Sequence, residues 1–197
     1  MRDLEKANLI TWRRYNHLNM KNSPQLTVSH SIYKDTHIEV MHDVLKQGTF
    51  SWNQVYLQWI NKNSICVIPF ENNGVYLVRQ YRHASRKKFW QFPGGLMEPK
   101  ISEKKLAEKE LAEEAGFKPG GIIKIGSFSP EPGLASVQVK VFLATRLRKV
   151  ERRLEKSELG MKLKFFPLPT VEKMIKKGQI ECGITLSSYL ILKLHLQ

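Results

Sequence analysis

Three glutamates share one face of a predicted helix near the middle of the chain. The stretch FWQFPGGLMEPKISEKKLAEKELAEEAGF spans residues 89–117, and its helical part carries Glu110, Glu113 and Glu114 before it ends at Gly116. Carboxylates spaced i, i+3 and i+4 lie side by side on a helix and repel, at a cost of roughly 0.2–0.5 kcal/mol per pair. A hard divalent cation such as Mg²⁺ would neutralise them, because it takes oxygen ligands from a few carboxylates and from substrate phosphates. The alternative is a solvated helix edge that pairs with distant lysines.

The apolar residues of the same helix indicate which way the acidic face points. Ala107, Leu111 and Ala115 form the adjacent stripe, which we expect to pack on a sheet. The acidic face therefore borders the core and does not lie opposite it. Lys105 and Lys109 fall on another side of the helix, so we do not expect them to neutralise the three glutamates directly.

Positive charge dominates the composition. The chain has 197 residues, and 32 Lys and Arg against 18 Asp and Glu give it a net charge of +14. Such a surplus favours anionic partners such as nucleotides, RNA or acidic surfaces, although it also serves simply to solvate a surface. The lysines are spread along the whole chain and form no compact block with arginines and aromatic residues, so specific nucleic-acid binding is the weaker expectation.

Several features indicate a cytoplasmic protein. No apolar run approaches the roughly 18 residues of a membrane helix, and the N-terminus lacks the apolar core of a signal peptide. Cys66 and Cys182 lie far apart without metal-ligand spacing, so we expect buried free thiols.

Alternating or β-rich runs, separated by turn signals, predict a series of strands. These are expected at residues 27–33, 36–45, 51–60, 64–70, 74–83, 121–129, 137–147 and 161–168. The turn between the fourth and fifth should use Asn73-Gly74 for positive φ. Ser102 is the expected N-cap of the glutamate helix, and helices should follow at 170–178, capped by Thr170, and at 183–196. This order predicts an α+β fold in layers.

The residues around the glutamates resemble the Nudix box, G-x5-E-x7-R-E-U-x-E-E-x-G-U, in which U is an aliphatic residue. The positions that agree are Gly95, Glu110, Leu111, Glu113, Glu114 and Gly116, with Phe117 at the last position. Ile101 replaces the first glutamate of the pattern, and Lys109 replaces its arginine. Lysine keeps the charge but loses the planar fork of arginine. Glu103 is one candidate to replace the missing glutamate, and the alternative is that it only stabilises the helix dipole.

Three further stretches are similar to the ADP-ribose pyrophosphatase branch of this family, so that the resemblance covers roughly residues 26–196. They are GVYLVRQYRHASRKKFWQFPGG, PGLASVQVKVFLA and KKGQIECGITLSSYLIL. The resemblance implies a Nudix α/β/α sandwich with a mixed sheet and an N-terminal β-rich segment. It divides the chain into a basic arm at 1–24, a β segment at 25–62 that helps to form a homodimer, and a Nudix domain at 63–197.

The resemblance also implies a set of site residues. Glu110, Glu113, Glu114 and the carbonyl of Gly94 would hold Mg²⁺ or Mn²⁺, and Glu113 and Glu158 would take part in catalysis. Glu155 is the other candidate for the glutamate on the late loop, and a solvated loop is the alternative for both.

Substrate contacts are implied at two further positions. Arg82 matches an arginine that meets substrate phosphate, unless it is an ordinary charge at a strand end. Trp52 lies near an aromatic that stacks on adenine, unless it belongs to the core or to a dimer interface. Val137 stands where this branch has an acidic residue, which makes ADP-ribose itself less certain as the substrate.

The function implied is metal-dependent hydrolysis of the pyrophosphate bond in a nucleoside diphosphate derivative, such as ADP-ribose or a nucleotide sugar, to a nucleoside monophosphate and a second phosphate. The net charge motivates a second reading, an enzyme that trims RNA 5′ ends. Ile101, Lys109 and Val137 together motivate a third, a non-catalytic nucleotide sensor. Retention of three mutually repelling glutamates argues against the sensor.

Overall fold

The computed structural model describes residues 23–60 and 63–197, so the predicted basic arm at 1–24 lies almost wholly outside the described residues. The chain forms two compact units. Residues 23–60 and the loop Glu131–Val137 belong to the first, and Asn63–Pro130 with Gln138–Gln197 make up the second. No helix among the described residues is long and apolar enough to cross a membrane.

The first unit is a three-stranded antiparallel sheet in the order β1-β2-β3. Its strands are β1 (Gln25–Lys34), β2 (Ile38–Gln47) and β3 (Phe50–Trp59), which confirms the three predicted strands. The loop at 131–137 is bound to the edge strand, because the Leu57 N–H donates to the Leu134 carbonyl at 2.7 Å and the Ser136 N–H donates to the Leu57 carbonyl at 3.0 Å.

The second unit holds six strands, among them β6, which the residue patterns alone did not predict. They are β4 (Asn63–Glu71), β5 (Gly74–Arg82), β6 (Lys87–Gln91), β7 (Phe117–Phe128), β8 (Gln138–Lys149) and β9 (Lys162–Pro167). Their order is β6-β5-β4-β8-β7, with β9 paired to β5. β4 and β8 run parallel, and the other pairs are antiparallel.

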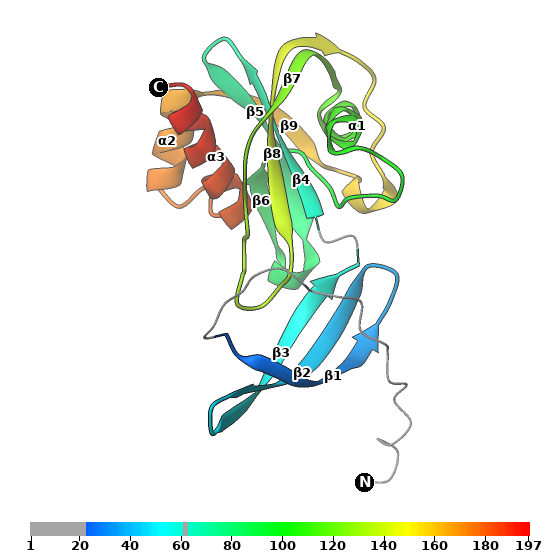
Figure 1. The fold of residues 1–197 in the computed structure, drawn as a ribbon. Helices are drawn as coiled ribbons and strands as arrows, with labels where there is room; N and C mark the ends of the chain where they lie inside the picture. Colours follow the sequence, from blue (N-terminus) through cyan, green and yellow to red (C-terminus); the bar gives the residue numbers. More distant parts are fainter. Residues whose placement is uncertain (1–22, 61–62) are drawn as a thin grey trace. The chain divides into compact units, whose positions relative to one another are not determined.

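Helices cover both faces of this sheet. Figure 1 shows α1 (Glu103–Ala115) on one side of the strands, and α2 (Leu168–Lys176) with α3 (Gly183–His195) on the other. Ala107, Leu111 and Ala115 of α1 are buried against β4, β7 and β8 residues, as the helical wheel predicted, and Leu106 is buried with them. A second apolar cluster joins the opposite face of the strands to α2 and α3.

The helix boundaries confirm one predicted cap and correct another. The Ser102 hydroxyl accepts a hydrogen bond from the Lys105 N–H at 3.3 Å, so Ser102 is the N-cap of α1. Thr170, in contrast, lies inside α2, which begins at Leu168 after Pro167. Proline in the first turn explains the earlier start, since Pro169 has a fixed φ suited to a helix and the first turn needs no N–H.

The turn between β4 and β5 also differs from the prediction. Positive φ values occur at Asn72 (49°) and Asn73 (53°), and Gly74 is not among the positive-φ residues. Gly74 is needed for space instead, because a Cβ at this position would collide with the Phe165 ring and lie 2.7 Å from the Phe166 carbonyl.

Candidate active site

A tight glycine turn lies directly on the carboxylates of α1. The Gly94 N–H donates to Glu114 Oε2 at 3.1 Å. A Cβ on Gly95 would collide with the Glu110 carboxylate, and one on Gly94 would collide with the Ile65 carbonyl. Backbone contact therefore restricts position 94 to glycine, whereas a side chain at position 95 would displace the Glu110 carboxylate; the turn brings backbone atoms against two side chains that lie one helical turn apart.

Burial disfavours the charged form of both carboxyls. The pKa of Glu114 is raised to about 9, chiefly by burial and further by the nearby Glu110 and Glu158, while the Gly94 hydrogen bond opposes the rise. Burial also raises the pKa of Glu110 to about 7, although Lys109 partly opposes this effect. Two partly desolvated carboxyls without an adjacent ion pair are the groups that a bound cation would convert to carboxylates.

The loop after β8 adds a third carboxylate to this pair. Glu158 ends the short 3₁₀ turn Lys156–Glu158, and its Oε2 accepts from the Glu155 N–H at 2.9 Å. It lies close enough to Glu114 for a side-chain hydrogen bond that raises the pKa of Glu114. The structure therefore brings Glu158 to the α1 carboxyls, while the exposed Glu155 serves to hold the turn.

Arg152 is a residue of this region that the sequence patterns missed. Its Nε donates to the Glu114 carbonyl at 2.7 Å, and Nη1 donates to the Met161 carbonyl at 3.4 Å. Within the described ranges Nη2 is buried without a hydrogen-bond partner. The guanidinium acts electrostatically on both Glu114 and Glu158. A basic run such as ERRLEK gives no periodic signal, so only the folded loop identifies the arginine that turns inward.

Lys109 and Glu98 form an ion pair beside the site. Lys109 Nζ lies 2.6 Å from Glu98 Oε1 and 3.7 Å from Glu113 Oε2. The expectation that Lys109 would not neutralise the glutamates is wrong for Glu113, because the flexible lysine stem reaches across one helical turn. Glu98, three residues before Ile101, supplies the acidic partner of Lys109.

Glu103 does not take the place of the missing box glutamate. Its Oε2 lies 3.0 Å from Lys124 Nζ of β7, so the carboxylate is engaged in an ion pair, although Glu103 lies two helical turns before Glu110 on nearly the same face. Ile101 is partly buried and packs against the apolar cluster beneath α1, so the substitution extends the core instead of leaving a gap.

Arg82 lies at the end of β5 and is exposed. Its Nε donates to Gln91 Oε1 at 2.9 Å, which fixes the side chain across to β6 and leaves the other guanidinium nitrogens without a hydrogen bond in the described part of the chain. Trp52 and Val137 belong to the first unit. Trp52 lies in β3 and is 37% exposed, whereas Val137 is 8% exposed.

Both cysteines are free. Cys66 is buried, and burial raises the pKa of its thiol to about 12. Cys182 is only half-buried, contrary to expectation, and Gln91 Nε2 donates to its sulfur at 3.5 Å.

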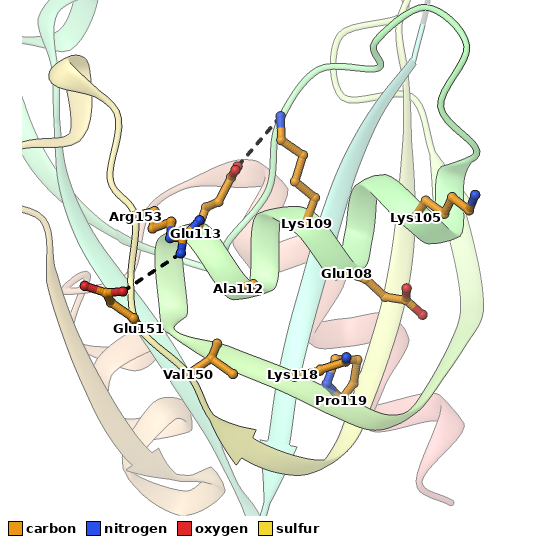
Figure 2. A pocket seen from close by; sticks show the side chains of 10 residues that line it. All are labelled: Lys105, Glu108, Lys109, Ala112, Glu113, Lys118, Pro119, Val150, Glu151 and Arg153. Carbon is orange, nitrogen blue, oxygen red and sulfur yellow. Dashed lines mark ion pairs between the residues drawn. The ribbon is translucent and has the colours of Figure 1, made fainter.

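A cavity of about 560 Å³ lies beside α1 (Figure 2). Its lining residues are Lys105, Glu108, Lys109, Ala112, Glu113, Lys118, Pro119, Val150, Glu151 and Arg153. Figure 2 shows ion pairs from Lys109 to Glu113 and from Arg153 to Glu151. Four cations face three carboxylates, so the charges of this cavity nearly cancel. Glu110, Glu114 and Glu158 do not line it, and it is distinct from the site that they form.

The oxygen donors of this site fit a hard divalent cation, although the side chains are not arranged as a complete coordination shell. Glu110 and Glu114 supply carboxylate oxygens of the type that Mg²⁺ prefers, next to the Gly94–Gly95 backbone, where the Gly94 N–H donates to Glu114 and the Gly95 carbonyl accepts from the Ile65 N–H at 2.8 Å. Within residues 23–60 and 63–197, no three His, Cys, Asp or Glu side chains are grouped so that they could already hold a metal ion. Glu113 is turned toward Lys109, whose Nζ lies 3.7 Å from Glu113 Oε2.

The sequence and the fold of this chain are similar to those of known proteins. The NUDIX domain family matches residues 61–181, which is more than half of the chain. An ADP-ribose pyrophosphatase of Mycobacterium tuberculosis is 28% identical over 134 residues. The aligned part is 64% of this chain and 63% of that protein, so the chain spans less than two thirds of the relative's length.

The crystal structure of an ADP compounds hydrolase superposes with a TM-score of 0.76. The superposed part covers 88% of this chain and 94% of the hydrolase chain, and the two sequences are 18% identical. At this identity the similarity concerns the fold alone. The predicted α+β fold with a mixed sheet between helices is thereby confirmed.

Proposed function

Because the chain belongs to the NUDIX family, we propose that it is a pyrophosphohydrolase that cleaves a nucleoside diphosphate derivative. The best candidates are ADP-ribose and other nucleotide sugars, with a nucleoside monophosphate and a sugar phosphate as products. The observation that carries the proposal is the pair Glu110 and Glu114, held against the Gly94–Gly95 backbone and desolvated there. The similar ADP-ribose pyrophosphatase supports the choice of substrate class.

The proposed cofactor is Mg²⁺ or Mn²⁺. When bound, such an ion neutralises charge on the pyrophosphate and lowers the pKa of a water molecule. Glu110, Glu114 and the Gly94 carbonyl would hold it, with Glu113 or Glu158 as a further ligand. This set is favoured because, among the described residues, neither Glu110 nor Glu114 has an ion-pair partner within 4 Å, whereas Glu113 has Lys109 at 3.7 Å.

The remaining roles fall to side chains around this pair. Glu158, which is half-buried and next to Glu114, is the proposed general base for the attacking water, with Glu113 as the second candidate. Arg152, whose Nε donates to the Glu114 carbonyl, offsets part of the negative charge of Glu114 and Glu158. Arg82 is proposed to bind substrate phosphate through the guanidinium nitrogens that Gln91 leaves free, and Trp52 is proposed to stack on the base.

The decisive experiment is a screen of ADP-ribose, other nucleotide sugars and triphosphorylated RNA with Mg²⁺ and Mn²⁺, in which the phosphorylated products are separated by chromatography or are converted by an added phosphatase to inorganic phosphate. We expect turnover of a nucleotide sugar that disappears with a chelator and in the Glu110→Gln variant. Turnover of RNA alone would favour the 5′-end reading. Metal-dependent nucleotide binding without turnover of any compound would favour the sensor.

We further propose that the enzyme is a homodimer formed through the sheet of the first unit. On one face of this sheet Val28 is paired with Val44, and His42 is paired with both His30 and Val55. Val28 and Val55 are each 50% exposed. A three-stranded sheet rarely persists without an apolar face that is covered, and a second copy would supply the cover.

Sedimentation equilibrium tests the dimer. The wild type should give twice the chain mass of 22.9 kDa, and the double variant Val28→Asp/Val55→Asp should sediment as a monomer. Leu190→Asp is the matched control, because Leu190 is 59% exposed on α3. A monomeric wild type, or a dimer that is indifferent to the double variant, would contradict the proposal.

A further inference from the structure

Strands β5, β6 and β9 carry an unusual balance of charge. Together they contain Arg79, Arg82, Lys87, Lys88, Lys162 and Lys164 and no carboxylate. Lys87 is paired with Glu181 at 2.6 Å. Among the described residues, none of the other five has an ion-pair partner within 4 Å. Part of the positive charge of the chain is therefore concentrated on these three strands. The even spread of lysines along the sequence did not indicate this.

The strand register places four of these cations on one face of the sheet. Arg79 is paired with Lys162 of β9 on one side and with Trp90 of β6 on the other. One row away along the strands, Leu77 is paired with Lys164, and one row away in the other direction Tyr81 is paired with Lys88. Alternate residues of a strand share a face, so these rows belong together. We call Lys88, Tyr81, Trp90, Arg79, Lys162 and Lys164 the basic strip.

The strip begins where the helices stop covering the sheet. Val75, Leu77 and Phe166 on the same face are buried in the cluster beneath α2 and α3. Arg79, Lys88, Lys162 and Lys164 are exposed, and the Tyr81 side chain is 49% exposed. The helices thus leave a bare end of the sheet that offers only cations and aromatic rings.

Aromatic rings alternate with the cations of the strip. The Arg79 guanidinium lies 5.7 Å from the Trp90 ring centre, and Lys164 Nζ lies 5.3 Å from the Phe166 ring centre. Rows that share a face repeat every two residues, about 6.6–6.8 Å along a strand. Cations at this repeat can follow a chain of phosphates, and the exposed Tyr81 ring gives a base a surface on which to stack, whereas Trp90 is half-buried and Phe166 is buried.

We propose that the basic strip binds single-stranded nucleic acid. A small anion would use one or two of the cations and would have no use for the exposed Tyr81. The cavity beside α1 is less suited to a polyanion, because its cations face nearly as many carboxylates. The strip is independent of the proposed hydrolase activity, since none of its residues has a part in the carboxylate site.

Fluorescence anisotropy of a labelled uridine dodecamer with the full chain tests this binding. The double variant Lys162→Glu/Lys164→Glu should bind at least about tenfold more weakly than the wild type. The control Lys105→Glu/Lys118→Glu makes the same change in net charge in the cavity beside α1, and it should lose less than about threefold. Equal losses in the two variants would overturn the proposal, because they would mean that only net charge matters.

Salt and stacking provide two further readouts. With four cations at phosphates, a plot of log affinity against log salt should have a slope of about −3, or about 50-fold loss between 50 and 200 mM. Tyr81→Ala should weaken binding about fivefold or more, whereas Tyr81→Phe should bind within about twofold of the wild type. Loss in both variants would exclude stacking and overturn the nucleic-acid assignment.

Competing ligands identify the partner. We expect the labelled RNA to be displaced by unlabelled single strands more readily than by duplex RNA, polyphosphate or vesicles that contain anionic lipid. Equal displacement by polyphosphate would reduce the strip to a phosphate-binding surface, and preferential displacement by vesicles would assign it to a membrane surface. Binding that vanishes when residues 1–22 are deleted, and not in the strip variant, would assign RNA to the arm. Each of these results would overturn the proposal.

Discussion

At the scale of single residues, Glu114 joins the helix to the glycine turn. Its carboxyl accepts from the Gly94 N–H, and its pKa is raised by burial to about 9. Without a cation, the group is therefore mostly protonated at neutral pH. Glutamine has nearly the same shape and also lacks charge, so it can replace the protonated form without disturbing the packing. The substitution removes only the ability to become a carboxylate ligand.

Glu114→Gln should accordingly keep the fold and abolish turnover. We expect kcat on ADP-ribose to fall at least about a hundredfold, because a lost metal ligand removes several kcal/mol of transition-state stabilisation. Mg²⁺ should raise the Tm of the wild type more than that of the variant. Glu108→Gln on the same helix is the control and should retain activity. Turnover of Glu114→Gln within tenfold of the wild type would eliminate the proposed site.

Glu98 explains how the chain tolerates two departures from the family pattern. Lys109 is already paired with Glu98 at 2.6 Å, so a glutamate at position 101 is not needed to hold it. Removing Glu98 leaves Lys109 free to pair fully with Glu113, which lies 3.7 Å away. That stronger pair would compete with any role of Glu113 at the metal.

We predict that Glu98→Gln lowers kcat/KM about threefold to tenfold and raises the Mg²⁺ concentration needed for half-maximal activity. Stability should change by less than about 1 kcal/mol, because the pair is partly exposed. Ile101→Glu in the Glu98→Gln background should restore activity, whereas Glu103→Gln alone should have no effect, since Glu103 pairs with Lys124. If Ile101→Glu did not restore activity in the Glu98→Gln background, the hypothesis that Glu98 takes the place of a glutamate at position 101 would be refuted.

At the scale of elements, the sequence predicted what depends on local patterns. Alternating or β-rich runs identified the strands other than β6, and Ser102 with Gly116 identified both ends of α1. The start of α2 was predicted too late because Thr170 has the residue type of an N-cap, whereas Pro169 is itself suited to the first turn of the helix. The inward turn of Arg152 and the Glu98–Lys109 pair depend on loops whose path no local pattern specifies. The register of three strands likewise gathers cations that are far apart in the sequence, since Arg79 is paired with Lys162, 83 residues further along the chain.

Helix α1 should make the metal-free protein less stable at alkaline pH. Glu110 and Glu114 have an ordinary pKa of 4.5, raised in the fold to about 7 and about 9. A raised pKa stabilises the fold fully below about pH 4.5, and this stabilisation is lost as the pH rises through the folded values. The loss has a limit of about 1.4 kcal/mol per pH unit for each group.

Thermal melts with a chelator between pH 5 and pH 9 measure this effect. The Tm should fall across the range, and most of the slope above pH 7 should disappear in Glu114→Gln. Saturating Mg²⁺ should flatten or reverse the slope, because the cation binds the deprotonated carboxylates. A Tm that rises with pH in the chelator would mean that these carboxyls are not desolvated in the fold.

At the scale of the whole molecule, the proposed small substrate does not account for the net charge of +14. The proposed substrate of the carboxylate site has two phosphates, so we expect only the few cations near that site to contribute to its binding. The basic strip and the N-terminal Arg13, Arg14 and Lys21 lie outside the residues proposed for catalysis. Salt should therefore distinguish catalysis from binding of nucleic acid.

We predict that kcat/KM on a nucleotide sugar falls less than tenfold between about 50 and 200 mM salt. Many phosphate contacts would instead cost about 10³-fold over the same range, because each releases condensed counterions. Deleting residues 1–24 should leave turnover nearly unchanged, and Lys162→Glu/Lys164→Glu should do the same while it impairs RNA binding. The measurement is a set of initial rates at matched Mg²⁺ for the wild type and both variants. A steep salt dependence of turnover, removed with the arm or with the strip, would mean that the nucleic acid itself is the substrate, and the RNA 5′-end reading would then replace the nucleotide sugar.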